Sequence, residues 1–333
     1  MNSSNLYARL SGNRSAESPT ETERPGESGS KKVIRKPRGF LSLVKPFPSI
    51  VVAMTIPLAG ILYGELHGQS GVQFLVANLG AVTLATISLF LTQAGYQSLN
   101  MSEDAAIDRQ TDHKSDRAIP SGRISRDEAR SLAWGTTLAG VGLAYTVNTE
   151  LGVFTLAHVA GGICYSLHPI RLKKRLWINL VCQAAARGLL LYPAAFAVFG
   201  DPLNPVAWGL GCVTFLLVLS MQNTADFADV DEDRANGITT PAVYHGPRSL
   251  VRIMAALAVF SFVTLFGLIY LGVLPNVWSL GLLALPVTWS LRELWNAPER
   301  VCSVTGNHSS YVVYYLCLLS MYVLPPIQLS LGH

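Results

Sequence analysis

The chain alternates between long apolar stretches and shorter polar segments, and this alternation predicts its architecture. A helix needs about 20 mostly apolar residues to cross a hydrocarbon core of about 30 Å. Helices on the surface of soluble proteins instead keep a polar face. Nine suitable stretches lie along the sequence, at 47–66, 74–99, 129–147, 150–167, 176–199, 205–225, 250–273, 276–295 and 310–330. We therefore predict an all-α, polytopic membrane protein with about nine transmembrane helices.

The composition agrees with a location in the lipid bilayer. Apolar residues make up 50% of the 333 residues and charged residues only 14%, whereas soluble domains carry about 25% charged residues. The first 38 residues differ, because they are rich in Ser, Glu, Arg, Pro and Gly and nearly free of large apolar side chains. Such a segment buries too little apolar surface to fold. We predict a disordered tail over residues 1–38 and one transmembrane domain over residues 39–333.

The basic residues predict the orientation of the domain. Of the 25 Lys and Arg residues, 24 lie before the first stretch or in and beside alternate loops, and the remaining one, Arg187, lies inside the fifth stretch. Loops rich in Lys and Arg stay on the cytosolic side of a membrane. We therefore expect a cytosolic N-terminus and a C-terminus on the opposite side.

A first set of acidic residues follows the second apolar stretch, in a loop expected on the cytosolic side. Asn100, Asp104, Asp108 and Asp112 recur at every fourth position. On a helix this spacing keeps the four side chains within one face. Pro120 is expected to stop the helix soon afterwards.

A second set follows the sixth apolar stretch, again on the side expected to be cytosolic. Asp226, Asp229 and Asp233 have the spacing i, i+3 and i+7 and would share a helix face. Asp231 would point nearly the opposite way. Either set alone is equally well explained as solvated charge in an ordinary loop. Two such sets, both at the inner end of a span, favour a binding site.

Clustered carboxylates need a partner. Two of them about 4 Å apart repel by about 4 kcal/mol at an effective dielectric constant of 20. Mg²⁺ prefers carboxylate and phosphate oxygens, so a metal held by both sets could clamp a diphosphate and neutralise its charge as it leaves. Four nearby basic residues could complete the cradle: Lys114, Arg117, Arg171 and Lys173.

Several sequence segments together resemble the UbiA superfamily of intramembrane prenyltransferases, over roughly residues 40–330. The acidic sets match its NxxxDxxxD and DxxDxxxD motifs. The flanking segments RAIPSGRIS (117–125), YSLHPIRLK (165–173) and DRANGITTPAVYHG (233–246) are similar to its other conserved segments. The resemblance implies helices around a central cavity and Mg²⁺-dependent chemistry on a prenyl diphosphate.

The resemblance also implies roles for individual residues. Two Mg²⁺ ions and the diphosphate would be bound by Asn100, Asp104, Asp108, Asp226, Asp229 and Asp233. Lys45 takes the place of a basic residue, usually Arg, near the start of the first helix, and Tyr165, Arg171 and Lys173 would hold the diphosphate or the acceptor. Met101, Ala118 and Ala225 depart from the family pattern, which leaves the substrate class open.

Arg187 and a few aromatic side chains are further candidates. A charge in the middle of a span costs about 2.5–3.5 kcal/mol, so Arg187 either contacts substrate in a cavity or forms a structural ion pair or hydrogen bond. Tyr96, Tyr192 and Phe196 could stabilise a carbocation, although packing is the more common role of such residues.

The expected activity is transfer of a prenyl group from a prenyl diphosphate to a lipophilic, most simply aromatic, acceptor. A terpene cyclase on the same scaffold, acting without an acceptor, is the alternative. A transporter with acidic cation sites ranks last, because no inverted repeat stands out. The sequence carries no HExxH, GxSxG, Walker or GxGxxG motif and no feature that indicates a nucleic-acid partner.

Overall fold

The structure is a computed structural model that describes residues 37–109, 114–227, 230–235, 237–296 and 309–332. For residues 225, 226, 232, 309 and 311 the description covers the backbone alone. Within these ranges the chain is helical and contains no β-strand. The all-α fold that the apolar stretches predict is therefore confirmed.

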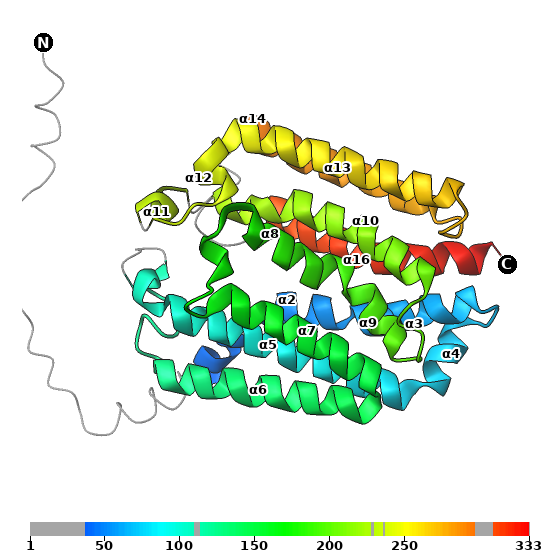
Figure 1. The fold of residues 1–333 in the computed structure, drawn as a ribbon, viewed down its shortest axis with the longest axis horizontal. Helices are drawn as coiled ribbons and strands as arrows, with labels where there is room; N and C mark the ends of the chain where they lie inside the picture. Colours follow the sequence, from blue (N-terminus) through cyan, green and yellow to red (C-terminus); the bar gives the residue numbers. More distant parts are fainter. Residues whose placement is uncertain (1–36, 110–113, 228–229, 236, 297–308, 333) are drawn as a thin grey trace, which may run out of the picture.

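The first half of the described chain forms the helices on one side of the bundle (Figure 1). A short helical segment at 37–44 precedes them. Lys45 separates it from α2, and Asn148 joins two antiparallel helices as the N-cap of the second. These helices are α2 (Pro46–Ala53), α3 (Thr55–Leu66), α4 (Gly71–Ala77), α5 (Leu79–Asp108), α6 (Arg126–Val147) and α7 (Thr149–Ser166).

The second half begins with a 3₁₀ turn at Leu172–Lys174 and a helix that contains a π-helical turn at Ala185–Leu189. Two further 3₁₀ segments lie at Gln222–Phe227 and Trp278–Leu283. The α-helices are α8 (Leu176–Ala184), α9 (Leu191–Ala197), α10 (Pro205–Met221), α11 (Val230–Ala235), α12 (Pro241–His245), α13 (Pro247–Tyr270), α14 (Ala284–Asn296) and α16 (Ser309–Leu331).

Every apolar stretch predicted from the sequence coincides with helical structure, but not every one has the features of a membrane span. Six helical segments in the described ranges are long and apolar enough to cross a bilayer: Pro46–Leu66, Leu79–Asp108, Leu176–Ala197, Pro205–Thr224, Pro247–Tyr270 and Val312–Leu331. Three other helices differ from these six. Helix α6 has a charged first turn, α7 contains Glu150 and His158, and α14 is short. The count of nine spans therefore stays a prediction.

Helices α5 and α6 pack closely because small residues line their contact. A side chain at Gly95 would collide with Ala133 and Thr137, and one at Gly140 would meet the backbone of Ser88. The Ser88 hydroxyl donates a hydrogen bond of 2.8 Å to the Gly140 carbonyl across the interface. Small residues of this kind let membrane helices approach closely.

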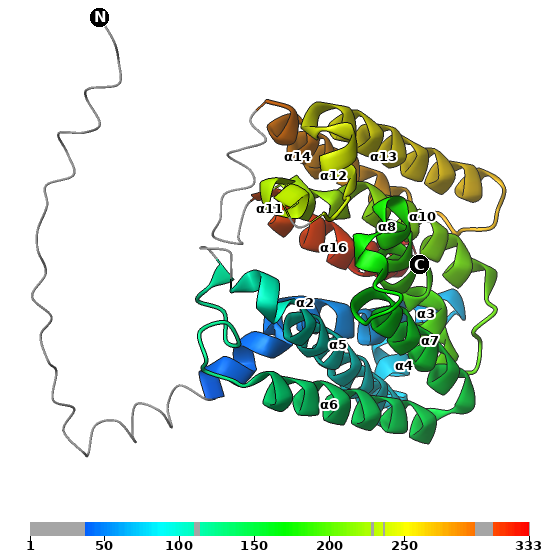
Figure 2. The ribbon, with the colours of Figure 1, turned by 60° about the vertical axis from the view of Figure 1, so that its left-hand side comes forward.

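The loops that carry the candidate residues gather at one end of the bundle. The C-terminal end of α5, the start of α8, and α11 and α12 all lie at that end, on the left in Figure 1. Helices α13 and α14 lie on the side of the bundle opposite α5 and α6 (Figure 2). The fold thus brings the two acidic segments, more than 100 residues apart in the sequence, to the same end of the molecule.

Candidate active site

Helix α5 presents the first acidic set as the sequence predicts. It runs without a break for 30 residues to Asp108, so Asn100, Asp104 and Asp108 lie on one face. At 1.5 Å per residue the helix is about 45 Å long, which exceeds the thickness of the hydrocarbon core by about 15 Å. Its last turns can therefore reach the aqueous interface. Asp112 lies outside the described residues.

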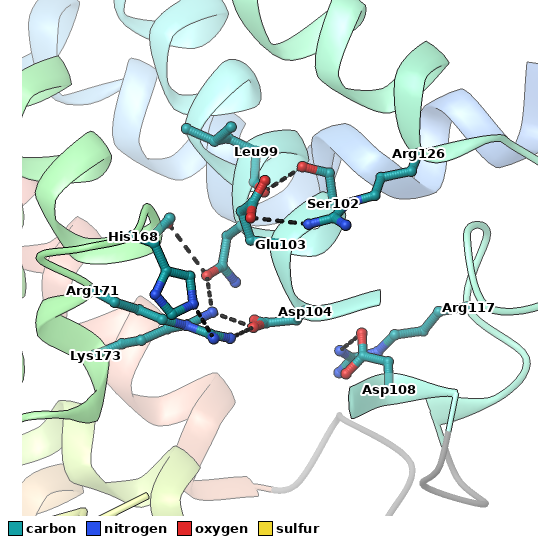
Figure 3. A network of polar contacts seen from close by, with 12 residues as sticks. Leu99, Ser102, Glu103, Asp104, Asp108, Arg117, Arg126, His168, Arg171 and Lys173 are labelled. Atoms are coloured by element: carbon teal, nitrogen blue, oxygen red, sulfur yellow. Dashed lines mark hydrogen bonds and ion pairs between the residues drawn. The ribbon is translucent and has the colours of Figure 1, made fainter. Parts of the chain in front are cut away.

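Two basic side chains from the loop between α7 and α8 reach Asp104 (Figure 3). The Lys173 ammonium forms an ion pair with the Asp104 carboxylate, and Arg171 Nη2 lies 3.2 Å from the same Oδ1 atom. Arg171 also contacts His168 Nε2 at 2.9 Å. Lys173 donates a second hydrogen bond, of 3.2 Å, to the side-chain oxygen of Asn100. The two positive groups compensate the negative charge of this face.

Asp108 has a cationic partner of its own on the opposite flank (Figure 3). Arg117 Nη1 lies 2.8 Å from Asp108 Oδ2, and the residue Asp108 is only 3% exposed. Arg117 belongs to the segment that follows α5, so the chain folds back over its own acidic face. The first acidic set is thus held between cations from two different loops.

Two of the basic residues sit at strained backbone positions. Lys45 has a φ angle of 42° and Arg171 one of 36°, both in the left-handed region that residues other than glycine seldom adopt. Such a conformation costs about 1–3 kcal/mol and persists where the surrounding structure imposes it. Lys45 is the N-cap of α2, and Arg171 directly precedes the 3₁₀ turn at Leu172–Lys174.

A cavity of about 270 Å³ joins the two acidic segments. Asp104 and Asp108 enter its wall from α5, and Asp233 enters from α11. Other candidates predicted from the sequence also line it: Lys45, Asn100, Lys114, Arg117, Tyr165, Lys173 and Arg187. Arg171 adjoins this site through its contact with Asp104.

The second acidic set departs from the regular helix that its spacing suggests. Helix α10 ends at Met221, a 3₁₀ segment follows over Gln222–Phe227, and α11 is described over Val230–Ala235. The backbone at Asp226 is thus 3₁₀ and not α-helical, and the shared face of the three aspartates stays a prediction. The Asp226 side chain and all of Asp229 lie outside the described residues, so their predicted roles stay predictions.

Asp231 behaves as its position in the sequence predicts. Its side chain is 99% exposed and pairs with Arg234 at 3.3 Å, one turn along the same short helix. It does not line the cavity that Asp233 reaches. The two acidic residues of α11 thus have different environments although they are two positions apart.

Burial shifts the pKa of two lysines that line the cavity and lie outside the spans. Burial lowers the pKa of Lys45 to about 8, and the nearby guanidinium groups of Arg117 and Arg187 act in the same direction. Burial also lowers the pKa of Lys173, while the Asp104 carboxylate opposes that shift. Lys45 can therefore lose its proton at mildly alkaline pH.

Sequence reasoning missed several residues that line the cavity. Tyr314 and Tyr315 come from α16, and polar side chains inside apolar stretches come from α5, α8 and the end of α10: Gln97, Asn179, Gln183 and Gln222. Gln183 donates a hydrogen bond of 2.9 Å to the Tyr165 hydroxyl and so orients it. Uncharged polar residues within spans were the available signal, since such groups avoid lipid. The two tyrosines gave no comparable signal.

A smaller chamber of about 20 Å³ adjoins the cavity and shares four of its wall residues, Arg187 among them. The amide group of Gln93 and Nδ1 of His158 also border this chamber, and neither has a hydrogen-bond partner among the described residues. Of the aromatic candidates, Tyr96 lines both spaces.

Tyr192 and Phe196 are fully buried instead in the helix core. Their position agrees with packing, the more common role of such residues.

The oxygen donors of the cavity suit Mg²⁺. Within the part of the chain that the structure describes, no group of three or more His, Cys, Asp or Glu residues could hold a metal ion. Mg²⁺ does not need one, because it is commonly bound by one or two carboxylates together with substrate phosphates and water. Asp104, Asp108 and the side-chain oxygen of Asn100 offer hard ligands of this kind on one helix face.

The comparison with known proteins covers most of the chain. Residues 53–323 match the family model of the UbiA prenyltransferase family. A digeranylgeranylglyceryl phosphate synthase of Methanopyrus kandleri is 30% identical over 250 residues, which cover 75% of this chain and 84% of the relative. A protoheme IX farnesyltransferase of Desulforudis audaxviator is 29% identical over 280 residues, which cover 79% of this chain and 80% of the relative.

Solved structures show the same fold. A UbiA homologue from Archaeoglobus fulgidus bound to GPP and Mg²⁺ superposes with a TM-score of 0.62 at 17% identity, over 87% of this chain and 99% of the other. The same homologue bound to DMAPP and Mg²⁺ gives a TM-score of 0.63 at 16% identity, over 87% of this chain and 98% of the other. The resemblance noted in the motifs is thereby confirmed, and this chain is a prenyltransferase of the UbiA family.

Proposed function

We propose that this enzyme binds a prenyl diphosphate with Mg²⁺ in the acidic cavity and transfers the prenyl group to a lipophilic acceptor. The observation that carries the proposal is the meeting of Asp104 and Asp108 with Asp233 around one cavity, although they belong to separate helical segments. Cationic groups on several sides make the same space suitable for a polyanion.

Acidic and basic residues of the cavity would have different roles. Lys173 and Arg171 hold Asp104 in place, and Arg117 holds Asp108. Lys45, Lys114 and Arg187 line the same cavity and would contact phosphate oxygens. Bound Mg²⁺ would neutralise the charge that develops on the departing diphosphate. Asp226 and Asp229 are proposed to add ligands from the second acidic segment.

Polar and aromatic groups deeper in the cavity would control the allylic carbon. Tyr96 and Tyr165 lie with ring centroids 5.8 Å apart in an edge-to-face arrangement, and both line the cavity. Their faces would stabilise positive charge on the prenyl group. The packed helices around them would exclude bulk water, which would otherwise capture that cation.

The acceptor is proposed to be an aromatic, lipid-soluble molecule. The relatives carry names that refer to different products and substrates, a glyceryl phosphate lipid in one case and protoheme IX in the other. The family therefore accommodates several acceptor classes. An apolar ring with one nucleophilic position could approach the allylic carbon from the membrane side of the cavity.

A product analysis tests the proposal. Purified enzyme would be incubated with geranyl, farnesyl or geranylgeranyl diphosphate, with and without a panel of phenolic acceptors, in Mg²⁺ or in excess chelator. We expect Mg²⁺-dependent release of diphosphate coupled to acceptor alkylation. Full Mg²⁺-dependent turnover by Asp104→Ala or Asp229→Ala would refute the assigned site. Hydrocarbon formation without any acceptor would instead identify a terpene cyclase.

A further inference from the structure

Helices α13 and α14 enclose a groove that is separate from the active site. The groove has a volume of about 410 Å³, and none of its lining residues lines the acidic cavity. Its walls are apolar along most of their length, with Ala255, Ala258 and Phe262 on α13 facing Val287 and Leu291 on α14. The two helices lie at the side of the bundle away from α5 and α6 (Figure 2).

One end of this groove is cationic. Arg252 and Arg292 line it there together with Trp295, and the guanidinium carbon of Arg252 lies 5.4 Å from the centroid of the Trp295 ring. Within the described ranges, neither arginine forms an ion pair with a carboxylate. Glu293 is the acidic neighbour in the sequence, but it is not among the residues that line the groove.

The cationic end of the groove lies near one end of each of its two helices. Arg252 is in the second turn of α13, and Arg292 is in the last turns of α14, which runs in the opposite direction. Tryptophan and arginine are typical of the interface between hydrocarbon and water. From Arg252 to Phe262 the apolar wall continues for about 15 Å at 1.5 Å per residue. An elongated apolar chain with an anionic end would fit this arrangement.

We propose that this groove binds an anionic phospholipid. The phosphate would accept hydrogen bonds from the Arg252 and Arg292 guanidinium groups, which suit phosphate geometry. One acyl chain would lie along the small side chains of Ala255 and Ala258. Basic pockets between membrane helices bind acidic head groups in this manner. The charge of the two arginines, unpaired within the described structure, distinguishes this groove from ordinary lipid-facing surface.

Native mass spectrometry of the purified full-length protein in a neutral detergent tests the charge requirement. We expect phosphatidylglycerol to be retained about tenfold more tightly than phosphatidylcholine of the same acyl composition. The double variant Arg252→Gln/Arg292→Gln should weaken phosphatidylglycerol binding by about 10–30-fold. Arg248→Gln is the matched control, because Arg248 lies one turn earlier on α13, is exposed, and does not line the groove.

A second pair of variants tests the groove itself. Ala255→Trp would fill the groove and displace the acyl chain, whereas Ala256→Trp places the same bulk on the exposed face of the same helix. We expect loss of the tightly held lipid only in Ala255→Trp. Thermal unfolding in detergent would show that each variant is folded, and inorganic phosphate at millimolar concentration should not compete.

Several outcomes would overturn the proposal. These are equal retention of the two lipids by the unaltered protein, unchanged lipid binding in the double arginine variant, and equal effects of Ala255→Trp and Ala256→Trp. Competition by inorganic phosphate alone would indicate a simple anion site. A dimer that is lost on Ala255→Trp would show that a second copy of the chain occupies the groove.

Discussion

The two acidic segments of the cavity are built in different ways. The first lies on α5, a helix of 30 residues, where regular spacing brings three oxygen-bearing side chains to one face. The second follows α10, which gives way to a 3₁₀ segment and then to the six-residue α11. The first segment thus presents its polar side chains from one long helix, and the second from shorter helical segments.

This difference suggests a division of labour between the two segments. Asp104 and Asp108 already have cationic partners from neighbouring loops, so their positions are defined before substrate arrives. None of the described side chains of α11 is fully buried, and segments with few buried contacts open more easily than packed helices. We expect the α5 side to determine where a diphosphate binds and the α11 side to complete its enclosure.

The largest effect is expected from Asp104→Asn. The change removes the negative charge that Lys173 and Arg171 face, and with it a proposed ligand for the Mg²⁺ that would bind the diphosphate. Loss of one group that stabilises developing charge typically costs about 100–1,000-fold in rate, and the upper end is expected here. Steady-state release of diphosphate, with protein folding checked by thermal unfolding, would measure it. A decrease of less than tenfold in this rate would indicate that the reaction takes place at another site.

The next effect tests the α11 side with a matched pair. Asp233 lines the cavity, whereas Asp231 is 99% exposed on the same short helix. We expect Asp233→Asn to lower kcat/KM by about 100-fold, and Asp231→Asn to leave it nearly unchanged. Equal effects of the two substitutions would mean that α11 acts through its overall charge and not through a specific ligand.

A smaller effect is expected from Lys173→Met. Lys173 contacts both Asp104 and Asn100, so its loss should misplace both side chains and lower kcat/KM by about tenfold. Lys174→Met is the control, because the adjacent lysine does not line the cavity. Mg²⁺ titration would separate weaker metal binding from slower chemistry. If both variants behave alike, the position of Lys173 in the site is unimportant.

The smallest effect on kcat/KM at neutral pH is expected at Lys45, which should instead determine how kcat/KM depends on pH. Because the pKa of Lys45 is lowered to about 8, the ammonium group that can pair with diphosphate is present below pH 8 and lost above it. The kcat/KM of the unaltered enzyme should therefore fall through this range.

The variant Lys45→Arg should keep its kcat/KM to higher pH, because a guanidinium group stays protonated. A Lys45→Met variant should show a lower kcat/KM and no such alkaline decline. The same alkaline decline in all three proteins would assign it to another group.

Some parts of this site could be predicted from sequence because they depend on local periodicity. The face formed by Asn100, Asp104 and Asp108 follows directly from the geometry of a regular helix. The apolar stretches likewise predicted where helices form. The contact of Arg171 and Lys173 with Asp104 was expected only in general terms, as a basic cradle.

Other parts depend on tertiary structure and could not be predicted in this way. The spacing of Asp226 and Asp233 suggested a regular helix, but the chain changes its helical geometry between them. The place of Tyr314 and Tyr315 in the cavity depends on how α16 packs against the other helices, and local spacing carries no information about that. The packing of Tyr192 and Phe196 into the core likewise depends on how the helices pack, which local spacing does not predict.

The left-handed backbone at Lys45 and Arg171 has a consequence for engineering. Glycine at either position would relieve the conformational cost, and a search for more thermostable variants would favour it. The same change would remove the Lys45 ammonium from the wall of the acidic cavity, or the Arg171 guanidinium that contacts Asp104. Stabilisation and turnover should therefore trade off at these two positions, so a hyperstable version of the enzyme would have to gain its stability elsewhere.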